Sequence, residues 1–293
     1  MAKRFHYGGQ AVIEGVMMRG PKLVKTAVRK PDGKIVSKTE PLNSIYTGRL
    51  RKMPFLRGIF TLIETLVLGV KALMYSADVA VESEIEEKPN PFMMWLPVVF
   101  GILLGVGLFV ILPMLITHYG VDRFTDSAML SNLADGLIRV VIFFGYLGAM
   151  SLMPDIRRVF AYHGAEHKTV NAYEGGVPLD PDHIQKFSTA HTRCGSGFLL
   201  IVLVIAIIIF VFTGQPALWL RMVSRLALLP VIAAFSYELI QFAADHTNNI
   251  LIRAIMRPSL AIQSMVTRQP DAQQIEVAVE ALQDVLEPED NPS

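Results

Sequence analysis

The chain has 293 residues, of which 52% are hydrophobic and only 18% are charged, and its formal net charge is +1. A typical soluble domain carries about 25% charged residues, and here the apolar residues collect in a few long runs. This pattern excludes an ordinary soluble domain, and the net charge gives no indication of a nucleic-acid partner. Cys194 is the single cysteine, so no intramolecular disulfide can form and nothing indicates an oxidising compartment.

Residues 1–54 are predicted to form a small β-rich unit. Two β-prone runs, Leu23–Lys30 and Lys34–Glu40, flank Pro31-Asp32-Gly33, which is a turn signal because Pro presets φ and Gly supplies a positive φ. The preceding segment 8–21 is punctuated by glycines and is interpreted as a tight hairpin. Glu14 and Arg19 on this hairpin are candidates to support a site at the membrane face.

Residues 55–91 are predicted to form an interfacial helix followed by an acidic linker. The run Ile59–Tyr75 is strongly apolar but contains Glu64 and Lys71. It is also shorter than the roughly 20 apolar residues that a transmembrane helix needs. It is therefore predicted to lie at the membrane surface or to re-enter the membrane. Glu82–Glu87 is interpreted as part of a solvated linker.

Residues 92–246 are predicted to form a four-span membrane domain. Four long apolar runs occur in this part of the chain: Phe92–His118, Leu133–Met153, Gly197–Thr213 and Met222–Ala244. Their lengths suit a hydrocarbon core about 30 Å thick. The predicted fold is thus an α-helical polytopic membrane protein with about four transmembrane helices, an interfacial helix and a small N-terminal β-rich unit.

Two ionisable residues within these runs need an explanation, because charge inside a membrane is costly. Arg139 is interpreted as a residue that extends its side chain to the interface. Glu238 lies near the end of the last run and is either hydrated at the interface or a supporting residue of a membrane-face site. A transporter would rest on Glu238 alone, and no inverted repeat supports one.

The orientation follows from the distribution of basic residues. Residues 1–91 contain 15 Lys/Arg and the loop 154–196 contains five, whereas the loops 119–132 and 213–225 contain one and two. Positive residues favour the cytosolic side, so both termini and the loop 154–196 are predicted to be cytosolic in a multi-pass protein of the plasma membrane. The expected partners are the lipid bilayer and an unidentified substrate or membrane protein, and no nucleic acid is expected. The C-terminal region 247–293 is predicted to contain an amphipathic helix capped by Asp271.

The loop 154–196 contains the strongest candidate site. His163 and His167 are four residues apart, so on a helix they share a face and can bind one metal ion. With Glu166 they form His-x-x-Glu-His, the arrangement of inverted zinc hydrolases, in which the Glu activates a metal-bound water. His191 and Cys194, at the end of the same loop, add two further ligand types. The cofactor is predicted to be zinc or another divalent transition metal, with Glu166 as general base.

An alternative without metal remains open at this point. His163 and His167 could bond to the end of a helix, and Cys194 could be a small buried apolar residue. Glu174 is a further candidate, eleven residues after His163 and on the same helix face. Eleven residues of helix rise about 16 Å, so Glu174 ranks below His191 and Cys194.

The chain resembles the YqhQ-like family of bacterial integral membrane proteins over nearly its whole length. The segments that carry the resemblance are Gly8–Pro21, Leu73–Ala77, His163–Glu174, His191–Cys194 and Thr267–Leu282. The family has no assigned function beyond a suspected metal-dependent activity, so the resemblance implies a membrane protein and adds modest support for a metal site. The chain departs from the pattern at Thr192, where a Pro is expected, but neither residue is a ligand type.

Two functions are therefore predicted as alternatives. The first is a metal-dependent membrane enzyme, a hydrolase with its site at the cytosolic membrane face. The second is a non-enzymatic assembly or scaffold protein with a structural zinc. Structural zinc has four protein ligands, whereas catalytic zinc keeps one position for water, so the number of ligands at the site discriminates between them.

Overall fold

The computed structural model describes residues 5, 7–43, 53, 55–81, 91–191, 194–246 and 249–286. The expected acidic linker Glu82–Glu87 and Thr192 lie outside these residues. The N-terminal strands form one antiparallel sheet in the order β1-β2-β3-β4, which confirms the predicted β-rich unit. The strands are β1 (Gly8–Val12), β2 (Gly15–Arg19), β3 (Leu23–Arg29) and β4 (Ile35–Pro41).

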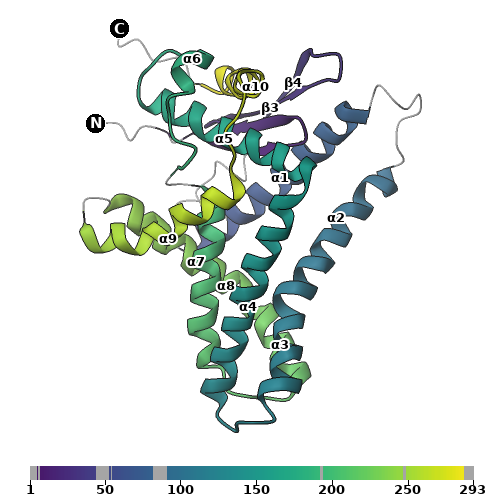
Figure 1. The fold of residues 1–293 in the computed structure, drawn as a ribbon, viewed down its shortest axis with the longest axis vertical. Coiled ribbons are helices and arrows are strands. Elements are labelled where there is room, and N and C mark those ends of the chain that lie inside the picture. Colours follow the sequence, from purple (N-terminus) through teal and green to yellow (C-terminus); the bar gives the residue numbers. More distant parts are fainter. Residues whose placement is uncertain are drawn as a thin grey trace.

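The remaining described elements are helical. The longer ones are α1 (Leu56–Val81), α2 (Pro91–Val106), α4 (Ala128–Leu152), α5 (Pro154–Glu174), α7 (Gly195–Val211), α8 (Leu218–Asp245), α9 (Ile250–Val266) and α10 (Ala272–Gln283). Short pieces complete them: η3 (Gly107–Ile111), α3 (Leu112–Ile116), η4 (Thr117–Val121) and α6 (Pro181–Ile184). A bundle of α2–α3, α4, α7 and α8 carries the sheet, α5, α6 and α10 at one end (Figure 1).

The hairpin expected within residues 8–21 is present, but no glycine forms its turn. Val12 pairs with Gly15, so Ile13 and Glu14 form a two-residue turn. Glu14, and not a glycine, adopts the positive φ of 50° there. In the turn between β3 and β4, Gly33 has a φ of 87°, as expected for Pro31-Asp32-Gly33.

Both faces of the sheet are covered. One face shares a core with α5 and α10, through residues such as Met18, Tyr162 and Ile275. The opposite face packs on α1, where Ala72 and Val79 join a second core. The sheet, α1, α5 and α10 therefore form one packed unit at the end of the bundle, called the terminal unit below, from segments that are far apart in the sequence. The predicted division into residues 1–54, 55–91, 92–246 and 247–293 stays a prediction.

Helix α10 closes this unit from the C-terminal side. Asp271 accepts a hydrogen bond from the backbone N of Gln274, and the Gln274 side chain accepts one from the backbone N of Asp271 in return. This is a capping box, which satisfies two helix N-terminal donors and confirms the predicted cap. Ile275 and Leu282 are fully buried, so the amphipathic pattern reflects packing on the sheet. Lys25, buried beneath α10, pairs with Glu280 of that helix and with its C-cap residue Asp284.

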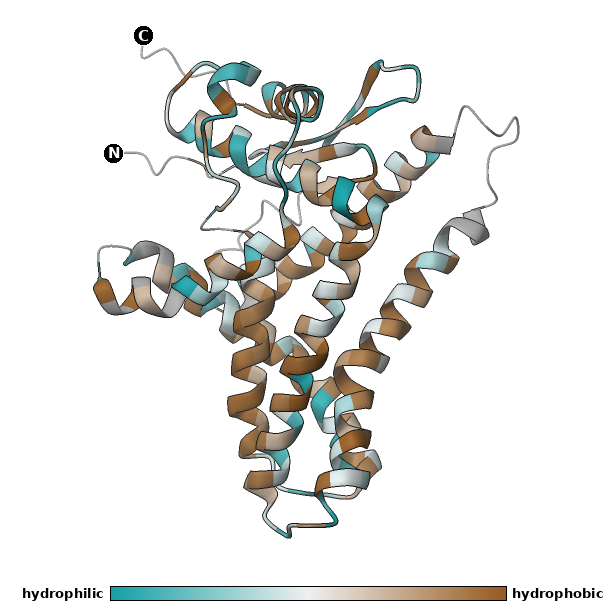
Figure 2. Cartoon of the chain, in the orientation of Figure 1, coloured by the Kyte–Doolittle hydropathy of each residue, from teal (hydrophilic) through white to brown (hydrophobic). Residues whose placement is uncertain are grey.

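Among the described residues, four helices are long and apolar enough to cross a membrane. They are Arg57–Ala80, Trp95–Val121, Ala128–Leu152 and Leu218–Ala243. Figure 2 shows that hydrophobic residues predominate along the helices of the bundle. Three of the four correspond to predicted spans. The fourth predicted span, α7, is apolar but has only 17 residues.

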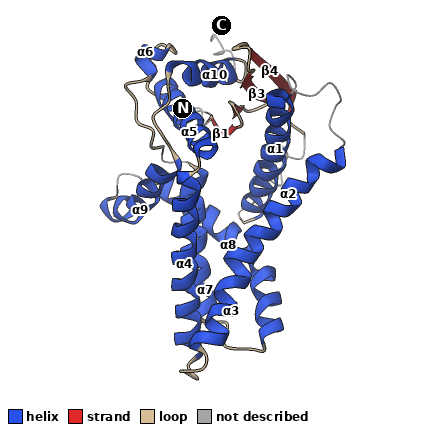
Figure 3. Ribbon diagram, turned by 45° about the vertical axis from the view of Figure 1, so that its right-hand side comes forward, coloured by secondary structure: helices blue, strands red, loops and turns tan. Residues whose placement is uncertain are grey.

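The helix expected around the apolar run 59–75 is present as α1, which has 26 residues. The expectation that it is too short to cross a membrane was wrong, because Arg57–Ala80 is long and apolar enough. Glu64 within it is buried and pairs with Arg19 of β2. The first turn of α1 packs at Gly58 against α8 near Ala234. Its second half lies beneath the sheet (Figure 3). The helix therefore connects the sheet with the end of the bundle.

The bundle buries a cluster of charged residues that includes Arg139, which was expected at the membrane interface. Arg139 and Arg225 both donate to the carboxylate of Asp135, over 2.8 and 2.6 Å. Their guanidinium carbons lie 5.1 and 5.2 Å from the centre of the Phe210 ring. Arg139 is only 5% exposed, so the expectation that it extends to the interface was wrong. A buried ion-pair network and an aromatic face satisfy this arginine instead.

Candidate metal centre

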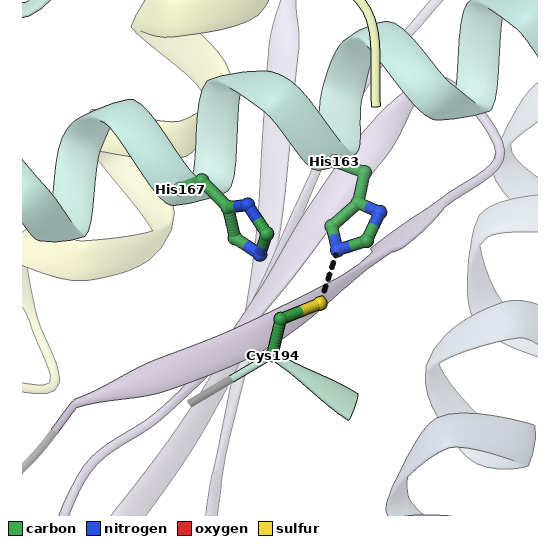
Figure 4. Close-up of side chains that lie close together, drawn as sticks. All are labelled: His163, His167 and Cys194. Carbon is green, nitrogen blue, oxygen red and sulfur yellow. Dashed lines mark hydrogen bonds between the residues drawn. The ribbon is translucent and has the colours of Figure 1, made fainter. Parts of the chain in front are cut away.

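Helix α5 carries four of the predicted site residues, which are His163, Glu166, His167 and Glu174. It begins with Pro154, which suits the first helical position, and Asp155 lies in the favourable first turn. It ends at Glu174, after which Gly176 adopts a φ of 68°. The expected helix is thus present, and His163 and His167 project from the same face of it toward Cys194 (Figure 4).

Three potential ligands meet at one point. Within the described residues, ligand atoms of His163, His167 and Cys194 all lie within 4.8 Å of one another. The Cys194 sulfur is 3.3 Å from Nε2 of His163, and the two imidazole rings are 4.4 Å apart between centroids. Zinc bonds of about 2.0–2.3 Å would draw the three side chains slightly closer together.

The backbone fixes the tautomers of both histidines. His163 Nδ1 lies 2.8 Å from the carbonyl oxygen of Val266, and His167 Nδ1 lies 2.6 Å from that of Thr189. A carbonyl only accepts, so each neutral ring carries its proton on Nδ1 and keeps a lone pair on Nε2. Metal-binding histidines show this arrangement of an outer hydrogen bond that orients the ring.

Cys194 lies at the start of α7 and faces the two histidines (Figure 4). It is the N-cap residue of α7, and its sulfur accepts a hydrogen bond from the backbone N of Ser196 at 3.4 Å. The thiolate is the form of cysteine that binds metals.

Glu166 lies beside His167, and its two carboxylate oxygens have different neighbours. Its Oε1 accepts from the backbone N of Gly9 at 2.9 Å, and its Oε2 lies 3.5 Å from Nε2 of His167. Burial acts to lower the pKa of His167, but the nearby Cys194 sulfur and the Glu166 charge outweigh it and raise that pKa. The surroundings therefore favour a cation at this point.

His191 and Glu174 lie next to this group rather than in it. The His191 ring centroid is 5.6 Å from that of His167. Its Nε2 lies 3.8 Å from the Glu174 carboxylate, and its backbone exchanges two hydrogen bonds with the Gln263 side chain. The structure thus brings three of the four predicted ligands together and places His191 beside them.

The other predicted supporting residues contact different elements. Glu14 pairs with Arg158, on the part of α5 before the histidines. Arg19 pairs with Glu64 of α1. Glu238 accepts from Arg57 at the start of α1.

Backbone groups of this site had no signal in the sequence. The carbonyls of Val266 and Thr189 orient the histidines, and the Gly9 amide holds Glu166. One residue did offer a signal, because Gly164 lies inside the His-x-x-Glu-His motif. A Cβ at Gly164 would lie 2.0 Å from the carbonyl oxygen of Arg268. The glycine is therefore required for the close approach of the segment that carries Val266.

The fold and the site define a class: a helical protein with membrane-spanning potential whose terminal α/β unit holds a His₂Cys group against the end of the bundle. Residues 53–288 match the family described as "Protein of unknown function (DUF1385)". The chain is also 33% identical to "Uncharacterized protein YqhQ" of Bacillus subtilis (strain 168), over 96% of this chain and 92% of that protein. The chain belongs to this family, as the resemblance implied. No solved structure matches it.

Proposed function

We propose that the protein is an integral membrane, zinc-dependent hydrolase with its site at the cytosolic membrane face. The observation that carries the proposal is the convergence of His163, His167 and Cys194, with both Nδ1 atoms bonded to backbone carbonyls. Two imidazoles and a thiolate suit zinc. When bound, zinc would lower the pKa of a water from 15.7 to about 7.

The number of converging ligands favours an enzyme over a scaffold. Three protein ligands leave one position of a tetrahedral zinc for water, whereas a structural zinc has four protein ligands. His191 would close the site as a fourth ligand, but its Nε2 lies by Glu174. Glu166 is not one of the three converging residues, yet it borders His167. That placement suits a general base that takes a proton from water.

The experiment that tests this proposal is metal analysis of the chain purified in mild detergent. We expect about one zinc per chain, because a thiolate and two oriented imidazoles bind zinc strongly. Chelation should remove the zinc, and added zinc should restore it. A well-folded chain that neither retains nor takes up a transition metal would overturn the proposal.

The proposed orientation places α5, the sheet and α10 in the cytosol, with α2–η4, α4, α7 and α8 as the spans. We expect single cysteines, introduced one at a time into a Cys194→Ala background, to report it. Cysteine at Asp126 or Ala217 should react with an impermeant reagent in intact cells. Cysteine at Asp182 or Gln283 should react only after lysis. All four positions are exposed, so burial would not protect them, and labelling of Asp182→Cys in intact cells would reverse the orientation.

A further inference from the structure

The metal centre lies at the depth where the apolar bundle ends. Cys194 is the N-cap of α7, and the helix that follows it directly is apolar over its whole length from Phe198 to Val211. An apolar helix without charge is stable in hydrocarbon, and its first turn marks the boundary of that layer. A ligand at the N-cap of this helix is therefore at the level of the lipid headgroups.

Helix α9 marks the same level independently. It crosses the first turn of α7 closely, since a Cβ at Gly197 would lie 2.0 Å from the Ser259 hydroxyl. In Figures 1 and 3 it runs out sideways from the bundle rather than along it. Its second half is anchored, with Ile262 and Gln263 almost fully buried. At the start of the helix, Ile250 is 72% exposed.

The composition of α9 suits a helix that lies in the membrane surface. The sequence ILIRAIMRPSLAIQSMV is amphipathic, with two arginines among large apolar residues. Helices of this kind bury their apolar face about 5–10 Å into the boundary between headgroups and acyl chains, with basic residues toward the phosphates. Arg257 and the apolar Ile250 are both exposed.

The surface helix and the metal centre are parts of one structure. The last residue of α9, Val266, provides the carbonyl that orients His163. Gln263, one turn earlier, holds the backbone of His191. Of the three converging residues, His167 is almost fully buried, whereas His163 and Cys194, next to α9 and α7, remain partly exposed. The open side of the centre is therefore the side that these two helices border.

We propose that the substrate is an amphiphile of the membrane, which reaches the metal from the lipid phase and presents a hydrolysable ester, amide or phosphoester bond at headgroup depth. This inference rests on the proposed zinc hydrolase. The apolar chains of the substrate remain in the bilayer beside α7 and α9, and its headgroup reaches His163 and Cys194. A water-soluble metabolite would gain nothing from a centre at this depth.

The test uses cobalt-substituted protein in lipid nanodiscs and three hydroxamates, which ligate the metal and change its visible spectrum. Acetohydroxamic acid is small and soluble, dodecanohydroxamic acid partitions into the bilayer, and a hydroxamate with a polyethylene glycol chain of the same length remains in water. We expect dodecanohydroxamic acid to saturate the spectral change at a total concentration lower by about tenfold or more than the other two, because partitioning concentrates it at the membrane surface.

The outcomes separate this inference from the proposed function. A cobalt spectrum that responds to acetohydroxamic acid but not to the dodecyl compound, or to all three equally, would overturn the lipid-phase substrate and leave the metal centre intact. A protein without a cobalt site would remove the proposed function and this inference with it. Cys194→Ser, which replaces the thiolate, should abolish the sulfur-to-cobalt band and so identify the centre that responds.

Discussion

Replacing His163 with Ala is expected to empty the metal centre. The substitution removes one of three converging ligands, and the two that remain, His167 and Cys194, cannot hold zinc with comparable strength. Loss of an outer partner alone costs about 10–100-fold in metal affinity, so the loss of a direct ligand should exceed 100-fold. Equilibrium dialysis against buffered zinc, followed by elemental analysis, measures the change.

A matched substitution separates this effect from a general loss of histidine. His183→Ala removes an exposed imidazole that bonds only to Asp180 in its own helix turn, and it should leave zinc binding unchanged. His167→Ala should behave as His163→Ala does. Equal zinc content in the wild type and in His163→Ala, with both proteins folded, would show that His163 is not a ligand.

Replacing Glu166 with Gln is expected to abolish function while zinc remains bound. The change keeps the size of the side chain, and the Gln oxygen can still accept from Gly9, but the carboxylate that would take a proton from water is lost. Removal of a general base costs about 10²–10⁴-fold in rate. Complementation of a strain that lacks the gene reports function, and metal analysis with thermal unfolding reports the site and the fold.

The same helix offers the control for this substitution. Glu174→Gln makes the same chemical change eight residues later, beside His191 and away from the three ligands, and should complement normally. The structural-zinc alternative predicts another pattern, in which Glu166→Gln complements and His163→Ala does not. Loss of zinc from Glu166→Gln would make Glu166 a ligand and end its assignment as a base.

The sequence predicted the parts of this molecule that depend on local pattern. The His-x-x-Glu-His spacing predicted a shared helix face for His163 and His167, and Asp271 with its following apolar residues predicted a capped helix. Lengths and partners were harder, because they depend on tertiary contacts. Helix α1 buries Glu64, and its partner Arg19 lies 45 residues earlier in the chain.

The site shows the same division between local and tertiary information. The pairing of Cys194 with His163 was predicted from ligand types, although these residues are 31 apart. The position of His191 outside the group was not predictable, since it follows from its two hydrogen bonds with Gln263 of α9. The carbonyls of Val266 and Thr189 are backbone groups and have no signature in a sequence.

The most direct test of the metal centre is X-ray absorption at the zinc edge of the purified protein. Bond lengths and ligand types report the coordination shell without any assumption about substrate. The account predicts two nitrogen ligands at about 2.0–2.1 Å, one sulfur at about 2.3 Å and one exchangeable oxygen. A shell without sulfur would exclude Cys194, and a shell of one sulfur and three imidazoles without oxygen would contradict a catalytic centre.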